Sequence, residues 1–426
     1  MIWKNILAVG VFCIICFLFF GLSLDNGFWN SYDFVSLENS LRMMTDTGAA
    51  FESEAPFKFQ PLVYGIHFLL FKCFFFNASG YFIFNILLHA LNSFLVYLLV
   101  QTLLHDRIVS FLSGLLFACT VGSYGKSIMI ASGLEDLVIT ALTLLTMLFY
   151  FRNGLKNNGR LLSPSFFFTL IFFLASIFTR STSFSILGAF MAFNFFFRKE
   201  TRARVFRVDF AVLLVIAVAA LIIKASVFHY TPALYSNHPG PVKFILYAAK
   251  NVINYLVRMI FPIHTSDLVT QSGLAVRFIY GFATAIRILI ALTVLSYSFF
   301  GFIFGNRTIR FFIAWTYIMV LPFAFFQFPY DWLNIRHLYL VSVGFVSVIA
   351  TGAVYCSRLI ASVKWRKFVP YIVPLAFIIM SRFIVTQLDQ SYEHKTASPS
   401  TLESRKALAE KFPFVRVNDG HLEIDR

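Results

Sequence analysis

The sequence Gly-Phe-Trp-Asn-Ser-Tyr-Asp occupies residues 27–33 and closely follows the first long apolar run of the chain. It belongs to residues 25–58, one of the few polar stretches in a very apolar sequence. Asp33 comes about nine residues after that run, so we expect its carboxylate to lie close to a membrane surface. A second acidic pair, Glu135 and Asp136, stands at the head of a later apolar run. These two polar positions are the first candidates for chemistry.

The composition is that of a membrane protein. Of the 426 residues, 59% are hydrophobic and only 13% are charged, and the mean hydropathy is +0.77. Soluble domains carry about 25% charged residues. We therefore expect a polytopic membrane protein. Its formal net charge of +15 can mark either a nucleic-acid surface or a membrane orientation, and the distribution of the basic loops decides between them.

Apolar runs of near-spanning length recur along the chain. A spanning helix needs roughly 20 apolar residues, and about eleven runs approach that length. They cover residues 5–24, 80–101, 108–123, 135–151, 164–180, 183–197, 209–228, 285–304, 311–328, 338–356 and 368–387. Two further runs, 60–76 and 244–262, fit either a span or a helix that lies on the membrane. The predicted fold class is an all-α polytopic bundle.

The distribution of Lys and Arg predicts the orientation. If the N-terminus is cytoplasmic and neither ambiguous run spans, the basic loops near 152–160, 198–207 and 358–367 all lie inside, as the positive-inside rule requires. A span at either ambiguous run would move the later basic loops outside, so we expect both runs to be helices in the outer interface. The basic charge is therefore an orientation signal, and we expect no nucleic-acid partner.

This topology divides the chain into two parts. Residues 1–388 form a transmembrane domain, whose outer loop at 25–79 carries interfacial helices, and residues 389–426 form a short non-cytoplasmic tail. Asp33, Glu135 and Asp136 then share the non-cytoplasmic face. ATP and nucleotide sugars are largely absent there, and the sequence contains no Walker or dinucleotide glycine pattern. A reaction on this face needs a donor that the lipid delivers.

Three ordered motifs resemble a known class of enzymes. Gln60-Pro61-Leu62 resembles a family "RPL", Ser132–Leu137 (SGLEDL) resembles "GRADLL", and Arg336–Phe345 (RHLYLVSVGF) resembles "RYLYLPSxGF". An Asn-His-Asn spacing at 85, 89 and 92 lies between the first two. Together they resemble the GT-C class of membrane glycosyltransferases, in particular bacterial relatives of the tetratricopeptide-containing transmembrane O-mannosyltransferases. This chain differs from the family at three places. The family usually has an acid where Tyr32 stands, an Arg where Gln60 stands, and Lys-Glu where Arg180-Ser181 stands.

The resemblance implies a GT-C-like bundle and a reaction. The expected enzyme is a polyprenyl-phosphate-sugar-dependent glycosyltransferase of the inner membrane of a bacterial cell. It would transfer a sugar with inversion to an acceptor protein, lipid or glycan on the non-cytoplasmic face. Asp33 would be the general base, and Asp136, with Glu135 beside it, the second site acid. The membrane lipid carries the donor, the C-terminus is non-cytoplasmic, and neither a metal nor another cofactor is expected.

Each acid also has a structural interpretation. Asp33 precedes residues 34–44, which read as a short amphipathic helix, so its carboxylate would suit an N-cap. Glu135 and Asp136 begin a membrane helix, where acids complement the helix dipole. In the functional interpretation, Asp136 binds the acceptor or a metal, or orients a cationic group across the site. A carboxylate near hydrocarbon is costly unless it is solvated or paired, which favours a cavity.

Cationic and polar residues complete the predicted site. A departing polyprenyl phosphate needs cations, and an arginine can bind it through two hydrogen bonds. The candidates are Arg336, Arg258, Arg180 and Lys224, with His337 and Tyr339 from the third motif. Gln60 and His67 are expected to line the substrate cavity. The alternative for these residues is solvation at the lipid headgroups.

The other histidines give no sequence evidence of a catalytic or metal site. His89, in mid-helix, is interpreted as a packing residue. His229, His238, His264 and Asp267 match no compact metal-ligand spacing. Two other functions stay open: a transporter or flippase for a lipid-linked sugar, and a catalytically degenerate GT-C scaffold subunit that binds a partner membrane protein.

Overall fold

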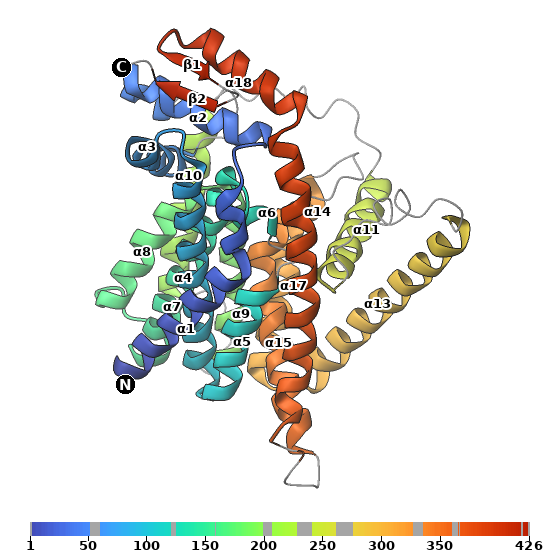
Figure 1. Cartoon of the computed structure of the whole chain (residues 1–426). Coiled ribbons are helices and arrows are strands. Elements are labelled where there is room, and N and C mark those ends of the chain that lie inside the picture. The colour runs from blue at the N-terminus through green and yellow to red at the C-terminus, as the bar shows by residue number, and fades with distance from the viewer. Residues whose placement is uncertain are drawn as a thin grey trace.

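The computed structural model describes residues 2–51, 60–120, 125–157, 159–198, 207–227, 241–260, 276–326, 335–359, 365, 367–418 and 421–424. The described chain is almost entirely helical, and most of its helices run side by side in one bundle (Figure 1). The apolar runs predicted to be helices do form helices. They are α1 (Ile2–Phe20), α4 (Ala78–Leu104), α5 (Arg107–Cys119), α7 (Leu134–Lys156), α8 (Pro164–Ile177), α9 (Ser185–Phe197), α10 (Val208–Val227), α13 (Val276–Phe304), α14 (Arg307–Phe326), α15 (Leu338–Arg358) and α17 (Val369–Thr396).

Within the described residues, six of these segments are long and apolar enough to cross a membrane: Asn5–Asp25, Ala78–Leu104, Ala131–Lys156, Ala285–Phe304, Leu338–Arg358 and Val369–Thr396. The predicted count of eleven is therefore not confirmed. Helices α5, α8 and α9 have 13, 14 and 13 residues. At 1.5 Å per residue they reach only about 20 Å, which is less than the roughly 30 Å hydrocarbon core of a bilayer.

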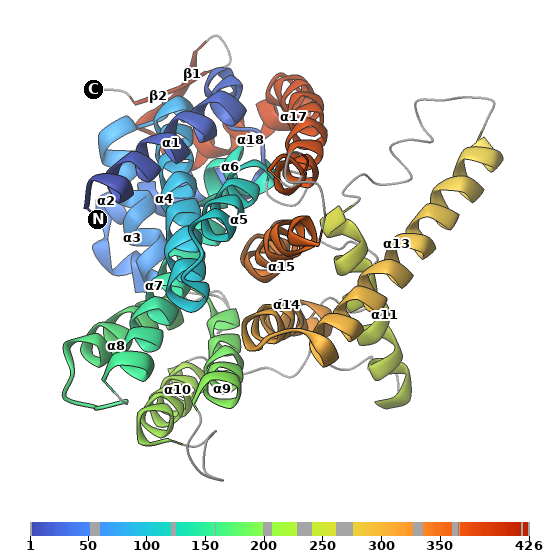
Figure 2. The same ribbon diagram turned by 90° about the horizontal axis from the view of Figure 1, so that it is seen from below.

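The two ambiguous runs are helices too, and neither belongs to the six candidate spans. They form α3 (Pro61–Phe74) and α11 (Pro241–Ile260). Both begin with proline, which suits the first helical position because the N–H that it lacks would have no partner there. Helix α11 packs against α14 and α13 at the side of the bundle, as the view from below shows (Figure 2).

One hydrophobic core joins the central helices. It includes Phe12 and Phe20 of α1, Trp315 of α14 and Tyr339 of α15, each 0–1% exposed. Helices α14 and α15 pack so closely that a Cβ atom at Gly344 would lie 2.4 Å from the carbonyl oxygen of Phe312. Only glycine permits that approach. The close packing fixes the position of the residues just before α15.

A second, smaller core lies at one end of the bundle. Helix α2 (Ser31–Thr45) and helix α18 (Pro399–Lys411) run across that end in Figure 1, with the hairpin of β1 (Val415–Asn418) and β2 (His421–Ile424) beside them. In the hairpin Val415 pairs with Ile424 and Asn418 pairs with His421 in antiparallel register. Leu37 and Leu41 of α2 are buried together with Leu408 of α18.

The C-terminal residues are continuous with the bundle. The boundary predicted between residues 388 and 389 falls inside α17, which continues to Thr396. Beyond it the tail forms α18 and the hairpin, which were not predicted, and packs against the Asp33-bearing helix. Asn26 donates a hydrogen bond to the Asp389 carboxylate at 2.8 Å, and Lys411 forms an ion pair with Glu38. The tail therefore holds the first loop in place.

Candidate active site

The start of α7 is fixed by close backbone packing. The short 3₁₀ helix η4 (Ala131–Gly133) leads directly into α7, so Glu135 and Asp136 occupy its first turn. Asn85 of α4 donates to the carbonyl oxygens of Ile128 and Ile130 at 3.4 and 2.9 Å. A Cβ atom at Gly133 would lie 1.9 Å from the Ser127 carbonyl oxygen, so no other residue fits there. The two acids are thus held at one end of the bundle.

Asp136 binds two arginines from distant parts of the chain. Its Oδ1 accepts from Nη1 of Arg180 at 2.6 Å, and its Oδ2 accepts from Nε of Arg336 at 2.7 Å. Ser127 Oγ also donates to Oδ2, at 3.2 Å. Asp136 is only 3% exposed. Of the roles predicted for it, the structure shows the orientation of cationic groups.

The two arginines have further partners. Arg180 lies between α8 and the 3₁₀ helix η5 (Ser181–Phe184), and its Nε forms an ion pair with Glu135 at 3.1 Å. Gln60 Nε2 donates to the same Glu135 oxygen at 2.7 Å.

Arg336 lies in the 3₁₀ helix η8 (Ile335–His337), and its Nη2 donates to the carbonyl oxygen of Ser132 at 3.1 Å. Burial opposes its charge, but the neighbouring Asp136 carboxylate raises the pKa of Arg336 above its ordinary value. Arg336 therefore stays cationic although only 9% of its surface is exposed to solvent.

These groups surround a cavity of about 490 Å³, a size typical of small-molecule pockets. Helix α2, helix α3, the start of α7, η5, α14 and η8 all contribute to its walls. The lining residues are Tyr32, Val35, Ser36, Asn39, Gln60, Val63, Tyr64, His67, Ser132, Glu135, Arg180, Ser181, Thr182, Phe323, Arg336 and His337. The cavity therefore brings together six of the predicted site residues: Glu135, Arg180, Arg336 and His337, with His67 and Gln60 as expected for the substrate cavity.

Asp33 lies behind the cavity wall and is fully buried. Its Oδ1 accepts from the backbone N–H of Ser132 at 2.8 Å, and its Oδ2 accepts from the backbone N–H of Asn30 at 3.3 Å. Its neighbours Tyr32 and Ser132 line the cavity, whereas Asp33 itself is not among the lining residues. Burial raises the pKa of Asp33, and the two N–H groups and Arg336 partly oppose that shift.

The structure corrects the N-cap alternative for Asp33. Helix α2 begins at Ser31, and Asn30 is its N-cap, with a side chain that accepts from the Tyr32 N–H at 3.0 Å. Asp33 is the third residue of the helix and completes a capping box. The predicted helix start at residue 34 was late because the capping residues come from the polar sequence 30–33. Asp33 thus has a structural role whatever its chemistry.

Comparison with known proteins identifies the architecture. No family model matches the chain, and no curated protein sequence is significantly similar to it. Oligosaccharyltransferase structures from Archaeoglobus fulgidus do match. An apo form gives a TM-score of 0.52 at 13% identity, covering 98% of this chain and 58% of that chain. A complex of AglB with an inhibitory peptide and a dolichol-phosphate gives 0.53 at 13% identity, with the same coverage. A form tethered to an acceptor peptide gives 0.50 at 14% identity, covering 96% and 58%.

The chain has a GT-C fold. It spans 58% of the length of the first two oligosaccharyltransferase chains that it matches. The likeness supports the GT-C class that the sequence motifs predicted, while the narrower resemblance to the O-mannosyltransferases stays a prediction. At this level of identity the comparison establishes the fold, and the residues of this chain must carry the argument for its activity.

His337 also lines the cavity, and Arg258 lies near it on α11. His337 stacks on Phe323 with 4.3 Å between ring centroids, and its Nδ1 lies 3.2 Å from the Tyr255 hydroxyl. Burial and the neighbouring Arg180 lower the pKa of His337 to about 3, so its imidazole is neutral. Arg258 is 9% exposed on α11. Burial raises the pKa of Tyr255, and Arg258 is close enough to oppose that shift.

Two predicted phosphate ligands lie elsewhere. Lys224 Nζ donates to the Ile177 carbonyl oxygen at 2.7 Å. The hydroxyl of Tyr339 lies 2.6 Å from Nδ1 of His89 and accepts from Asn92 at 3.2 Å. Neither Lys224 nor Tyr339 lines the cavity. His89 and Asn92 thus form a buried network that joins α4 to α15, which agrees with the packing role interpreted for His89.

Some site features had no sequence signal. The Ser132 backbone N–H, the Phe323 ring and the Tyr255 hydroxyl all contribute, but they carry no charge and fit any membrane helix. The four metal candidates His229, His238, His264 and Asp267 lie outside the described residues. Within the described part of the chain, no three His, Cys, Asp or Glu side chains are placed to hold a metal ion. The expected absence of a metal stays a prediction.

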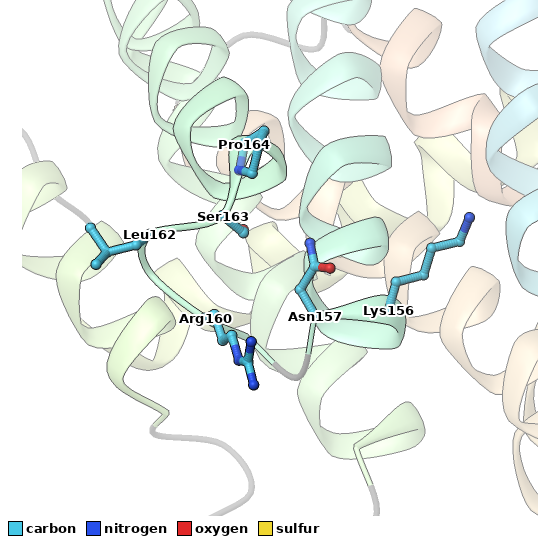
Figure 3. A pocket seen from close by; sticks show the side chains of 6 residues that line it. All are labelled: Lys156, Asn157, Arg160, Leu162, Ser163 and Pro164. Atoms are coloured by element: carbon cyan, nitrogen blue, oxygen red, sulfur yellow. The ribbon is translucent and has the colours of Figure 1, made fainter.

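A second cavity, of about 620 Å³, lies at the other end of α7. It is lined by Lys156, Asn157, Arg160, Leu162, Ser163 and Pro164. Lys156 is roughly 30 Å from Asp136 along the helix, at 1.5 Å per residue. Figure 3 shows Lys156 and Arg160 extending away from one another. Because these cations do not converge and no carboxylate lines the cavity, it lacks the arrangement seen around Asp136.

Proposed function

We propose that this protein is a membrane glycosyltransferase that moves a sugar from a polyprenyl-phosphate donor to an acceptor. One observation carries the proposal. Two arginines, the buried Arg336 and the partly buried Arg180, are fixed by the Asp136 carboxylate in the wall of the cavity, with Asp33 directly behind the cavity lining. A cavity with fixed cations and an adjacent carboxylate suits the departure of a phosphate and the loss of a proton.

The arginines would stabilise the leaving group. A polyprenyl phosphate gains negative charge as its bond to the sugar breaks, and guanidinium groups aimed at that charge lower the barrier. Asp136 and Glu135 hold Arg180 and Arg336 before the donor arrives, so little reorganisation is needed. Asp136 thus acts as a positioning residue. The neighbouring Arg258, with Tyr255 and His337, would extend the donor site towards α11.

Asp33 would take the proton. The acceptor's oxygen or nitrogen attacks the anomeric carbon, the bond from that carbon to the phosphate oxygen breaks, and the acceptor's proton moves to Asp33. The configuration inverts in this single step. Oδ2 of Asp33 accepts only the longer bond of 3.3 Å from Asn30, so it is the oxygen with the weaker hydrogen bond to the protein. A raised pKa makes Asp33 a stronger base than an ordinary aspartate.

The comparisons support the donor class. One oligosaccharyltransferase of the same fold binds a dolichol-phosphate together with an inhibitory peptide, and another carries a tethered acceptor peptide. For this chain we infer a lipid-phosphate donor of the same chemical kind. The acceptor is a protein, a lipid or a glycan. Neither the flippase nor the scaffold alternative is favoured by these neighbours.

The location is also part of the proposal. We place the chain in a bacterial inner membrane, with the N-terminus cytoplasmic and the cavity on the non-cytoplasmic face. Helix α1 begins at the end of the bundle opposite the hairpin (Figure 1), as an odd number of crossings requires. The basic residues Lys156 and Arg160 lie at the end away from the cavity, where the positive-inside rule places the cytoplasm.

The test is sugar transfer in proteoliposomes. We expect the wild type to transfer radiolabelled sugar from at least one member of a panel of polyprenyl-phosphate sugars. Arg336→Gln should lose about 100-fold or more in rate, because it removes the cation from the phosphate. Arg160→Gln, at the other end of α7, is the matched control and should keep the wild-type rate. Absence of transfer with every donor, together with absence of thermal stabilisation by any of them, would contradict the proposal.

A further inference from the structure

The cavity has two unlike walls. One wall carries Arg180, Arg336 and Glu135. The other wall comes from α2 and α3, and these lining residues carry no formal charge at neutral pH: Tyr32, Val35, Ser36, Asn39, Val63, Tyr64 and His67. The charged wall already has a role in the proposed function. The uncharged wall has a separate set of polar groups, which that role does not use.

His67 is the most informative residue of the uncharged wall. It lines the cavity from α3 and is only 4% exposed. Within the described chain it makes no hydrogen bond and no ion pair, although buried polar groups nearly always have a partner. Because its side chain faces the cavity, we expect a bound molecule to supply the missing partner.

The chemistry of that partner follows from the state of the imidazole. Burial, together with the charge of Arg336, lowers the pKa of His67 to about 4. At neutral pH the ring is therefore uncharged and offers one N–H donor and one nitrogen acceptor. A hydroxyl group also donates once and accepts, so it matches this ring better than a carboxylate or an ammonium group does.

Helix α2 adds further neutral groups. Tyr32, Ser36 and Asn39 follow one another at helical spacing and share one face. Ser36 Oγ donates to the Tyr32 carbonyl oxygen at 3.0 Å and keeps its lone pairs for a ligand. Asn39 lines the cavity, makes no hydrogen bond within the described residues, and offers both a carbonyl oxygen and an amide N–H₂.

From this arrangement we infer that the α2–α3 wall is the sugar subsite, that it selects an uncharged sugar rich in hydroxyl groups, and that His67 is its specificity-determining residue. The inference rests on the proposed function, in which the wall with Arg180 and Arg336 holds the phosphate. The α2–α3 wall has no charged side chain in its lining to pair with the carboxylate of an acidic sugar or the ammonium group of an amino sugar. An uncharged hexose needs no such partner and satisfies the imidazole of His67.

The experiment measures binding of three probes to the purified full-length protein in nanodiscs: polyprenyl phosphate, polyprenyl-phosphate hexose and polyprenyl-phosphate hexuronate. The wild type should bind the hexose form about tenfold more tightly than the bare phosphate, as one or two hydrogen bonds would give. It should bind the hexuronate form no more tightly than the bare phosphate.

Three variants separate the outcomes. His67→Phe should bind the bare phosphate like the wild type and lose the preference for the hexose. His67→Gln keeps a donor and an acceptor and should retain part of the preference, which excludes misfolding as the cause. Leu69→Phe, at an α3 residue that is 64% exposed, is the control and should match the wild type.

The inference is overturned if the hexose preference survives in His67→Phe, or if the wild type binds the hexuronate as tightly as the hexose. Equal binding of hexose and bare phosphate by the wild type would overturn it as well, while leaving the phosphate site intact. Absence of binding for all three probes would instead remove the proposed function, and the sugar subsite with it.

Discussion

Two buried ion pairs stand at opposite ends of α7 and differ in what surrounds them. At one end Arg198 and Asp209 form two parallel hydrogen bonds of 2.9 and 2.7 Å. Both are nearly fully buried, and the guanidinium lies 5.0 Å from the centre of the Tyr150 ring. The pair matches one cation with one carboxylate, and neither partner lines the nearby cavity.

The other pair is built differently. Asp136 holds two arginines instead of one, and both Arg180 and Arg336 line the cavity of about 490 Å³. The comparison shows that a buried Arg–Asp contact alone is weak evidence for a functional site, because such a pair also serves packing. A shared carboxylate and an adjoining cavity are what distinguish the cluster at Asp136.

The largest expected effect comes from removing one partner of either pair. Asp209→Ala and Asp136→Ala each leave a buried arginine without its carboxylate, which costs about 3–5 kcal/mol of stability. Thermal unfolding in detergent should show a large fall in melting temperature for both variants. If Asp209→Ala melted at the wild-type temperature, the pair of Arg198 and Asp209 would not be structurally important.

A paired replacement sharpens the same comparison. Arg198→Met combined with Asp209→Leu removes both charges and should remain folded, since apolar replacement of a buried pair is often neutral. This variant should keep sugar transfer. Arg336→Met combined with Asp136→Leu should also fold but lose transfer. Loss of transfer in both double variants, with folding intact, would contradict the distinction between the two pairs.

The next effect comes from replacing an arginine with a lysine. Arg180 binds Glu135 through Nε and Asp136 through Nη1. A lysine carries a single ammonium group and cannot reproduce this fork, so Arg180→Lys should lower the transfer rate by about 10- to 100-fold. The steady-state rate of sugar transfer from the donor measures this fall. Arg160→Lys at the other end of α7 should have no effect, and an equal fall there would point to a general loss of folding.

The pH dependence of the rate should report on Asp33. Because burial raises the pKa of Asp33 in the folded protein, transfer should fall as the pH drops through a midpoint above the ordinary aspartate value. The raised pKa also means that ionisation of Asp33 costs stability as the pH rises through that midpoint. Asp33→Asn should therefore lose this pH dependence of stability. A pH–rate profile with its acid limb at or below the ordinary aspartate pKa would contradict the assignment.

The smallest effect is expected at the tail. Lys411 pairs with Glu38 at the surface, where their side chains are 48% and 25% exposed. Exposed ion pairs contribute about 0.2–1 kcal/mol, so Lys411→Gln should shift the melting temperature only slightly. Transfer should stay at the wild-type rate. A large loss of stability would show that the tail fixes the first loop mainly through this pair and not through the apolar contacts of α2 and α18.

The sequence predicted the helices well because an apolar run needs only its own residues to form a helix in a membrane. Motif position likewise placed Arg336 and Asp136 in one site. Arg180 was predicted as a phosphate ligand too, but the sequence did not show that Asp136 would bind both arginines, because Arg180 and Arg336 lie 44 and 200 residues from Asp136 and meet it only when the bundle packs. Lys224 was predicted as a phosphate ligand but does not line the cavity. Its partner is a backbone carbonyl oxygen, and no pattern of side chains in the sequence reveals such a partner.

Asp33 shows a second limit of sequence reasoning. Its polar neighbours predicted a helix start, but the N-cap is Asn30, three residues earlier. The contact with the Ser132 N–H comes from a segment 99 residues away and depends on the tight turn at Gly133. Chemistry carried by backbone groups leaves little trace in a single sequence.

The most direct measurement is the transfer of radiolabelled sugar from a polyprenyl-phosphate donor by the wild type and by Asp33→Asn in proteoliposomes, with donor binding measured in parallel. We expect Asp33→Asn to fold and to bind the donor like the wild type, because Arg180 and Arg336 are unchanged, and to lose transfer by at least about 100-fold. Equal transfer by the two proteins would contradict a role for Asp33 as the base.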